Sequence, residues 1–147
     1  ECFSTFLDCI PRDETRQRQG FYEQVARCYE ERPDLQLLLR EAQGKELLEA
    51  GERLQALRVL CCAASEHAKE GRLIMPLVEP SVEVMEAQSK YVIPMIPFLD
   101  KTVMRFPKQR MGRMSAAFQR LAELYIPLYE AVGRKKDADK LRRKAGF

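Results

Sequence analysis

Cysteine and histidine are the side chains with which this sequence could perform nucleophilic or metal chemistry. The 147-residue chain has a single histidine, His67, and five cysteines: Cys2, Cys9, Cys28, Cys61 and Cys62. Cys61 and Cys62 precede His67 by six and five residues, whereas side chains that meet on a helix are three or four residues apart. No CxxC pair supplies the paired thiolates of a zinc site. The sequence therefore predicts neither a thiol-dependent enzyme nor a metal centre, and we expect buried, reduced thiols.

Paired carboxylates are the second arrangement that could carry chemistry. Glu46 with Glu49, and Glu83 with Glu86, each place two acids on one helical face. Such pairs bind metals or transfer protons when histidines or further acids accompany them, and none does here. The chain also lacks the nucleophile elbow, the phosphate-binding glycine loop and the dinucleotide fingerprint. We expect a protein that is not an enzyme and uses no cofactor.

The elements that must position these side chains are predicted to be helices. Apolar residues recur every three or four positions over 17–31, 35–48, 54–68 and 114–132, and a short helix follows over 135–145. Asp34 is expected to cap the second helix, and Gly71 and Gly133 to end later ones. The pattern predicts an all-α fold, with six to eight helices packed as antiparallel hairpins in an α-solenoid-like bundle. One domain over residues 1–147 is expected.

Prolines break the middle of the chain into shorter pieces. We expect a helix opened by Pro80 and ended by Pro94, and another over 98–106 that ends before Pro107. Strands over 73–78 and 91–96 are the alternative, because valine and isoleucine are frequent there. The apolar stretches over 73–78 and 93–98 are expected to fill the core, or else to line a groove that takes up a partner helix.

Two stretches of the sequence repeat one arrangement of residues. The first contains Gly44, Leu47, Gly51, Ala56, Leu60 and Ala63, and the second repeats its last five positions 82 residues later as Tyr129, Gly133, Ala138, Arg142 and Ala145. This spacing resembles the tetratricopeptide-type helical hairpin and the looser coat-protein α-solenoids. The resemblance implies a protein-interaction scaffold and transfers no particular binding residue. Gly51, Ala56, Gly133 and Ala138 are expected to let neighbouring helices approach closely, and the helix over 35–48 is expected to bend or pause at Gly44 or Gly51.

Charge is distributed unevenly along the chain. Residues 1–100 hold 12 lysines and arginines against 18 acids, whereas residues 101–147 hold 13 against 4. We therefore expect the basic third to bind a partner. The candidate residues fall in two groups, which are Lys101, Arg105, Lys108, Arg110 and Arg113, and then Arg134, Lys135, Lys136, Lys140, Arg142, Arg143 and Lys144.

The partner expected from these charges is another protein with an acidic surface or peptide. The main hypothesis is thus a non-enzymatic scaffold or adaptor within a larger assembly. The alternative is an RNA- or DNA-associated domain that uses residues 101–147, with Phe106, Met111 and Phe147 as stacking groups. A salt titration distinguishes the two, because phosphate-driven binding weakens steeply with salt.

The compartment is predicted from what the sequence lacks. Its longest uncharged run, from Tyr91 to Leu99, is too short to span a membrane and contains two prolines. The first residues show no basic region of the kind that opens a signal peptide. We expect a cytoplasmic or nuclear protein, and we expect this chain to be part of a longer one.

Overall fold

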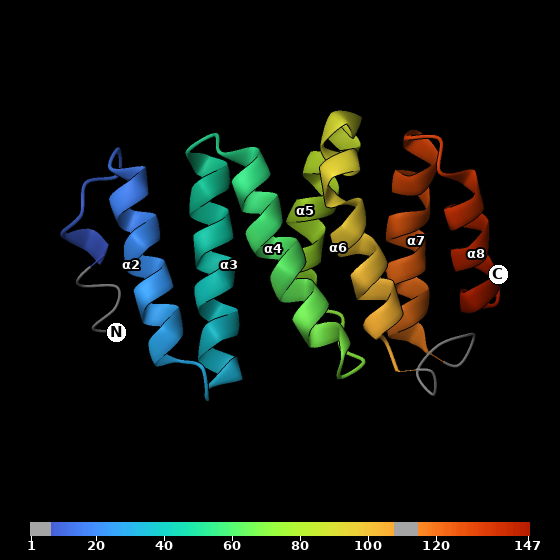
Figure 1. Ribbon diagram of the computed structural model, residues 1–147, viewed down its shortest axis with the longest axis horizontal. Coiled ribbons are helices and arrows are strands. Elements are labelled where there is room, and N and C mark those ends of the chain that lie inside the picture. Colours follow the sequence, from blue (N-terminus) through green and yellow to red (C-terminus); the bar gives the residue numbers. More distant parts are fainter. Residues whose placement is uncertain (1–6, 108–114) are drawn as a thin grey trace. The chain divides into compact units, whose positions relative to one another are not determined.

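The chain is all-α. A computed structural model describes residues 7–107 and 115–147, and within those ranges it contains helices and turns but no strand (Figure 1). The helices are α2 (Thr15–Cys28), α3 (Pro33–Glu49), α4 (Arg53–Ala68), α5 (Met75–Ala87), the 3₁₀ helix η1 (Ser89–Tyr91), α6 (Val92–Arg105), α7 (Ala116–Ala131) and α8 (Lys135–Ala145). The all-helical prediction is confirmed, and the strand alternatives over 73–78 and 91–96 are wrong.

Two compact units make up the chain. The first comprises residues 1–59 and the second residues 60–147, so the boundary falls inside α4 and not in a connecting loop. That residues 1–147 form one domain stays a prediction. It implies that the two units unfold together.

The first unit is centred on α2 and α3. Its apolar core gathers Leu7, Tyr22, Ala26 and Leu39. Helix α3 begins directly at Pro33, whose missing N–H is harmless in a first turn. Asp34 was expected to cap this helix and does not. It forms an ion pair with Arg32, the residue at the N-cap, at 3.3 Å. No pause occurs at Gly44, because α3 runs through it to Glu49, whereas the chain does turn at Gly51.

The second unit contains the prolines of the middle of the chain, and there the boundaries predicted at Pro80 and Pro94 were wrong, whereas the helix end before Pro107 was predicted to within one residue. Pro80 lies inside α5, which begins five residues earlier at Met75. Pro94 lies in the first turn of α6, so it does not end a helix. Prolines near a helix start remove N–H groups that have no intrahelical acceptor, which explains why Pro76 and Pro94 are tolerated. The short final helix was predicted correctly over 135–145.

Four helices end in the same glycine turn. Gly51, Gly71, Gly133 and Gly146 all have positive φ, between 71° and 82°. After Gly51, the N–H of Glu52 donates to the Leu47 carbonyl at 2.9 Å, and after Gly133 the N–H of Arg134 donates to the Tyr129 carbonyl at 2.8 Å. These turns satisfy carbonyls that would otherwise lack a donor at the helix end.

Gly51 and Gly133 were predicted to let neighbouring helices approach closely, and this prediction is wrong. A Cβ atom built on Gly51 or Gly133 would meet nothing within 4 Å, so their role is the left-handed backbone of the turn. The two alanines that follow these turns, Ala56 and Ala138, are fully buried. The repeated spacing therefore marks a shared turn followed by a small buried side chain.

Candidate protein-interaction site

Helix α8 is strongly amphipathic. Ala138, Leu141 and Ala145 are buried, and the helix packs antiparallel to α7 (Figure 1). Every basic residue of the predicted cluster on and before this helix lies outside that buried stripe. The sequence folds this way because three small or apolar residues at helical spacing are enough to attach a short helix whose other positions are charged.

Three of the predicted partner-binding residues are engaged inside the second unit. Arg105 on α6 donates to the Ser65 hydroxyl and to Glu66 on α4, both at 2.8 Å. Arg142 pairs with Glu130 at 2.7 Å and with Asp139 at 2.8 Å. Arg134 pairs with Asp137 at 3.3 Å. Arg105 and Arg142 thereby connect helices, whereas the Arg134 pair lies within the first turn of α8. All three are weaker candidates for a partner than the sequence suggested.

The other cations of the prediction have no ion-pair partner in the part of the chain that the structure describes. They are Lys101, Lys135, Lys136, Lys140, Arg143 and Lys144. Five of these six lie within ten consecutive residues of α8, which concentrates the positive charge on one short helix. Lys108, Arg110 and Arg113 lie outside the described residues.

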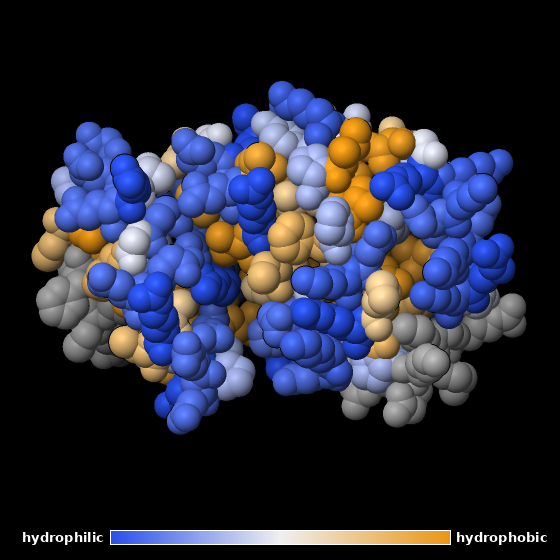
Figure 2. Space-filling view, in the orientation of Figure 1, coloured by the Kyte–Doolittle hydropathy of each residue, from blue (hydrophilic) through white to orange (hydrophobic). Residues whose placement is uncertain are grey.

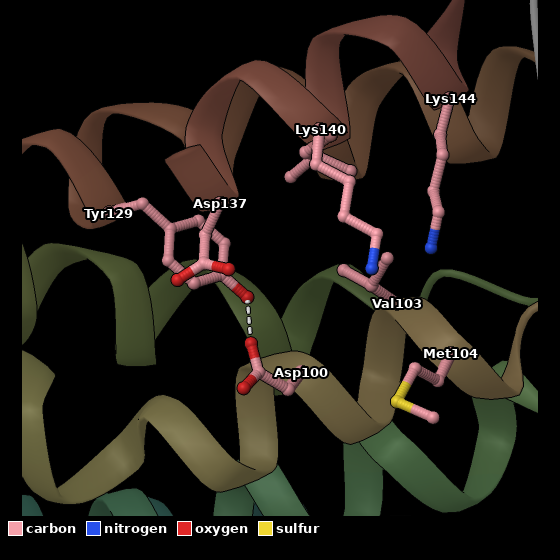
Figure 3. Close-up of a pocket in the computed structure, with 8 residues that line it drawn as sticks. Asp100, Val103, Met104, Tyr129, Asp137, Lys140 and Lys144 are labelled. Carbon is pink, nitrogen blue, oxygen red and sulfur yellow. Dashed lines mark hydrogen bonds between the residues drawn. The ribbon is translucent and has the colours of Figure 1, made fainter. Parts of the chain in front are cut away.

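A pocket of about 150 Å³ lies between α6 and α8. Helix α6 contributes Asp100, Val103 and Met104 to its lining, and α8 contributes Asp137, Lys140 and Lys144. Figure 3 shows the two lysine side chains extending from α8 toward Val103 and Met104, while the two aspartates lie together at the other end. The pocket therefore has an acidic end, a basic end and an apolar floor.

A hydrogen bond fixes the acidic end of the pocket. The Tyr129 hydroxyl on α7 donates to Asp100 Oδ1 at 2.7 Å (Figure 3). Burial, together with this bond and the nearby negative charge, raises the pKa of Tyr129 well above its usual value, so the phenol keeps its proton. Asp100 is thereby held in one orientation, and its Oδ2 accepts no hydrogen bond from the residues that the structure describes.

Exposed apolar side chains continue the pocket along α6. Met104 is 74% exposed and Ile93 65% exposed, and the exposed Pro97 lies between them at helical spacing. Figure 2 shows apolar surface over the N-terminal part of α6. The sequence predicted that this part of the chain either fills the core or lines a groove. Met95, Ile96 and Leu99 are buried in the core, whereas Ile93, Pro97 and Met104 face outward.

The stacking groups expected for nucleic acid are less favourable than the sequence indicated. Phe106 is buried and packs edge-on against Phe118, with ring centroids 5.3 Å apart. Phe147 is exposed, and Met111 lies outside the described residues. A base could therefore stack on Phe147 but not on Phe106.

The chain has no match among known protein families, characterised proteins or solved structures. Within the described residues, no cluster of histidine, cysteine and acidic side chains is suited to hold a metal ion. None of the described helices combines the length and the apolar character that crossing a bilayer requires.

A buried ionic cluster in the first unit was not foreseen. Arg18 is 2% exposed and donates to the carboxylate of Glu46, to the Leu7 carbonyl at 2.8 Å and to the Ile10 carbonyl at 2.6 Å. The Tyr22 hydroxyl donates to the same carboxylate at 2.5 Å. Burial alone would favour neutral Glu46, but the bonds from Arg18 and Tyr22 outweigh it and lower the pKa of that acid. This cluster attaches the segment before α2 to the helix pair, which is a structural role.

The thiols also differ from expectation. Among the described cysteines, Cys61 is buried, while Cys9, Cys28 and Cys62 are exposed. Burial raises the pKa of the Cys61 thiol to about 12, which makes it a poor nucleophile. Helix α4 is continuous through Cys61, Cys62 and His67, so the spacing argument against a Cys–His pair applies directly.

Sequence reasoning located the lysines of the pocket but missed its other wall. The spacing of Lys136, Lys140 and Lys144, each four residues apart, could have indicated one basic face of α8. No local signal pairs Tyr129 with Asp100, because 29 residues separate them.

Proposed function

We propose that this chain is a helical-hairpin interaction module that binds another protein through the basic surface of α8. The observation that supports it most is a concentration, on one short helix, of cations that form no ion pair within residues 7–107 and 115–147. They are Lys135, Lys136, Lys140, Arg143 and Lys144. Solvated cations on an isolated surface are common, but here they adjoin an exposed apolar stripe on α6. Exposed apolar groups rimmed by charge are typical of docking surfaces.

The resemblance to helical-repeat scaffolds adds support to this proposal. The turns at Gly51 and Gly133 share their backbone geometry, and each is followed five residues later by a fully buried alanine. Helical-hairpin repeats of this kind usually present surfaces to other proteins rather than pockets for catalysis. We further propose that the module works without a cofactor, in the cytoplasm or nucleus, where exposed thiols stay reduced.

Affinity capture tests the proposal. Deleting α8 would uncover apolar side chains of α7, so charge removal is the sounder change. We would compare the intact chain with a variant in which these five cations of α8 are replaced by glutamine, each with and without nuclease treatment. A protein retained after nuclease treatment by the intact chain, and lost by the variant, supports the proposal.

Two other outcomes would contradict the proposal. Retention that disappears on nuclease treatment, and that weakens steeply between low and moderate salt, would favour the nucleic-acid alternative. Equal retention by the intact chain and the glutamine variant would show that α8 does not recruit the partner. Circular dichroism of both proteins confirms that the substitutions leave the helices intact.

A further inference from the structure

The pocket between α6 and α8 combines two kinds of contact that a single peptide could satisfy. Lys140 and Lys144 are one helical turn apart, so their attachment points are separated by about 6 Å along α8. Both side chains reach over Val103 and Met104 (Figure 3). Carboxylates on alternate residues of an extended chain are separated by about 6.6 Å, which matches this spacing.

The apolar floor is suited to an aliphatic side chain. Met104 is the most exposed of the large apolar side chains in the described residues, and methionine adapts to the shape of what it contacts. Lys101 lies on the exposed face of α6 between Pro97 and Met104, which extends the alternation of charge and apolar surface away from the pocket. An occupant must therefore present acidic and apolar groups close together.

The acidic end of the pocket determines which way round an occupant can bind. Asp100 and Asp137 line the end away from Lys144, and Asp100 is fixed by Tyr129. These aspartates repel phosphates and carboxylates alike, so the anionic groups of an occupant must lie at the Lys144 end. Backbone N–H groups of a peptide can instead donate to the free oxygen of Asp100, while its carboxylates face the lysines.

We propose that this pocket receives a short segment of a partner protein in which acidic residues flank an aliphatic side chain. The carboxylates pair with Lys140 and Lys144, and the aliphatic group packs on Met104 and Val103. This inference rests on the proposed function, since it names the site and the partner chemistry for the same interaction surface.

Methyl NMR provides a direct test, because it detects weak binding at Met104. The chain is labelled at its methionine methyl groups, and the Met104 resonance is assigned by its loss in Met104→Ala. The probes are end-blocked hexapeptides made of four glutamates and two leucines in different orders, compared with hexaglutamate and with hexathymidylate. We expect at least one mixed peptide to shift the Met104 resonance at a concentration where hexaglutamate does not.

Two double variants locate the binding. Lys140→Gln with Lys144→Gln removes two charges from the pocket, and Lys135→Gln with Arg143→Gln removes two from α8 outside it. The first pair should weaken the peptide's affinity by about tenfold, and the second by less than about twofold. The methionine spectra of the free variants report whether the fold is kept.

The remaining outcomes separate this inference from the proposed function. Equal weakening by both double variants, or an equal shift with hexaglutamate, would show diffuse charge attraction and overturn the pocket while leaving the interaction module standing. A larger shift with hexathymidylate would overturn the peptide assignment in favour of nucleic acid. If no peptide shifts Met104 while affinity capture still recovers a partner that depends on the α8 charges, only the pocket inference fails.

Discussion

Tyr129 on α7 donates a hydrogen bond to Asp100 on α6, and this bond joins a buried phenol to the wall of the candidate pocket. The two residues are far apart in sequence, so the bond forms only when α6 and α7 pack as they do here. A hydrogen bond to a carboxylate contributes more to stability than one between neutral groups. The shape of the pocket therefore depends on the same helix packing that stabilises the second unit.

Replacing this phenol tests that link. Tyr129→Phe should lower the free energy of unfolding by about 1–2 kcal/mol, because Asp100 loses a donor while the ring stays in place. Urea unfolding followed by circular dichroism measures the change. Tyr91→Phe is the control, since no hydrogen bond of its hydroxyl is present in the described structure, and it should change stability by less than about 0.5 kcal/mol. Equal effects of the two substitutions would contradict the assigned role of the bond.

Arg18 should be critical for the first unit. Arg18→Met leaves the Glu46 carboxylate without its main partner and two backbone carbonyls without their donor, so we expect a loss of about 3 kcal/mol. Arg16→Met lies on the same helix at an exposed position and should be nearly neutral. Thermal and urea unfolding measure both variants. A small effect of Arg18→Met would show that the cluster contributes little to stability.

Acid should destabilise the chain through Glu46. Its pKa in the folded state lies below its ordinary value of 4.5, so its contribution is fully present above that value and is lost as the pH falls through the folded pKa. The free energy of unfolding should therefore decrease as the pH is lowered below about 4.5. Glu46→Gln should reduce the slope of this decrease. An unchanged slope in that variant would assign the acid sensitivity to other carboxylates.

Two glycines should respond to alanine with opposite signs. Gly133→Ala places a side chain at a φ of 77° and should cost about 1 kcal/mol, although nothing obstructs the new methyl group. Gly20 lies inside α2 with open space around it, and Gly20→Ala should stabilise the chain by about 0.5–1 kcal/mol. Thermal unfolding resolves the two signs. Stabilisation by Gly133→Ala would contradict the role assigned to the turn.

Alkylation of Cys61 tests whether the two units unfold together. At pH 8 this thiol should react far more slowly than exposed Cys62, as measured by mass spectrometry of labelled peptides, because it is buried and its pKa is about 12. If residues 1–147 form one cooperative domain, a loss of stability in the first unit also exposes Cys61 in the second unit more often. Arg18→Met should then raise the rate of Cys61 alkylation by about a hundredfold. An unchanged rate would indicate independent unfolding.

The helices of this protein were largely predictable from its sequence, whereas the pocket was not. The apolar stripes of α4, α7 and α8 have the helical period, and Gly71 and Gly133 form the expected turns. The proline-rich middle misled the prediction, since Pro76 and Pro94 occupy first turns and Pro80 is accommodated inside α5. Whether a proline is accommodated in a helix depends on its position in that helix and on the packing around it. Neither can be read from the neighbouring residues alone.

The same distinction applies to the candidate site. Basic residues are visible in the sequence, but ion pairs made across helices decide which of them remain available. Arg105 and Arg142 are engaged by Glu66 and Glu130 from neighbouring helices, whereas Lys140 and Lys144 are left at the pocket. The residues opposite these lysines come from α6, far away along the chain. Such pairings depend on tertiary structure.

The position of the unit boundary inside α4 limits how the chain can be divided. A protease that cut near residue 59 would leave stubs of seven to nine helical residues on each product, too short to stay helical alone. Cleavage in the loop after Gly71 would instead keep α4 whole. Shorter versions of the protein should therefore begin or end outside this helix, because a cut within it would leave an incomplete helix on both products.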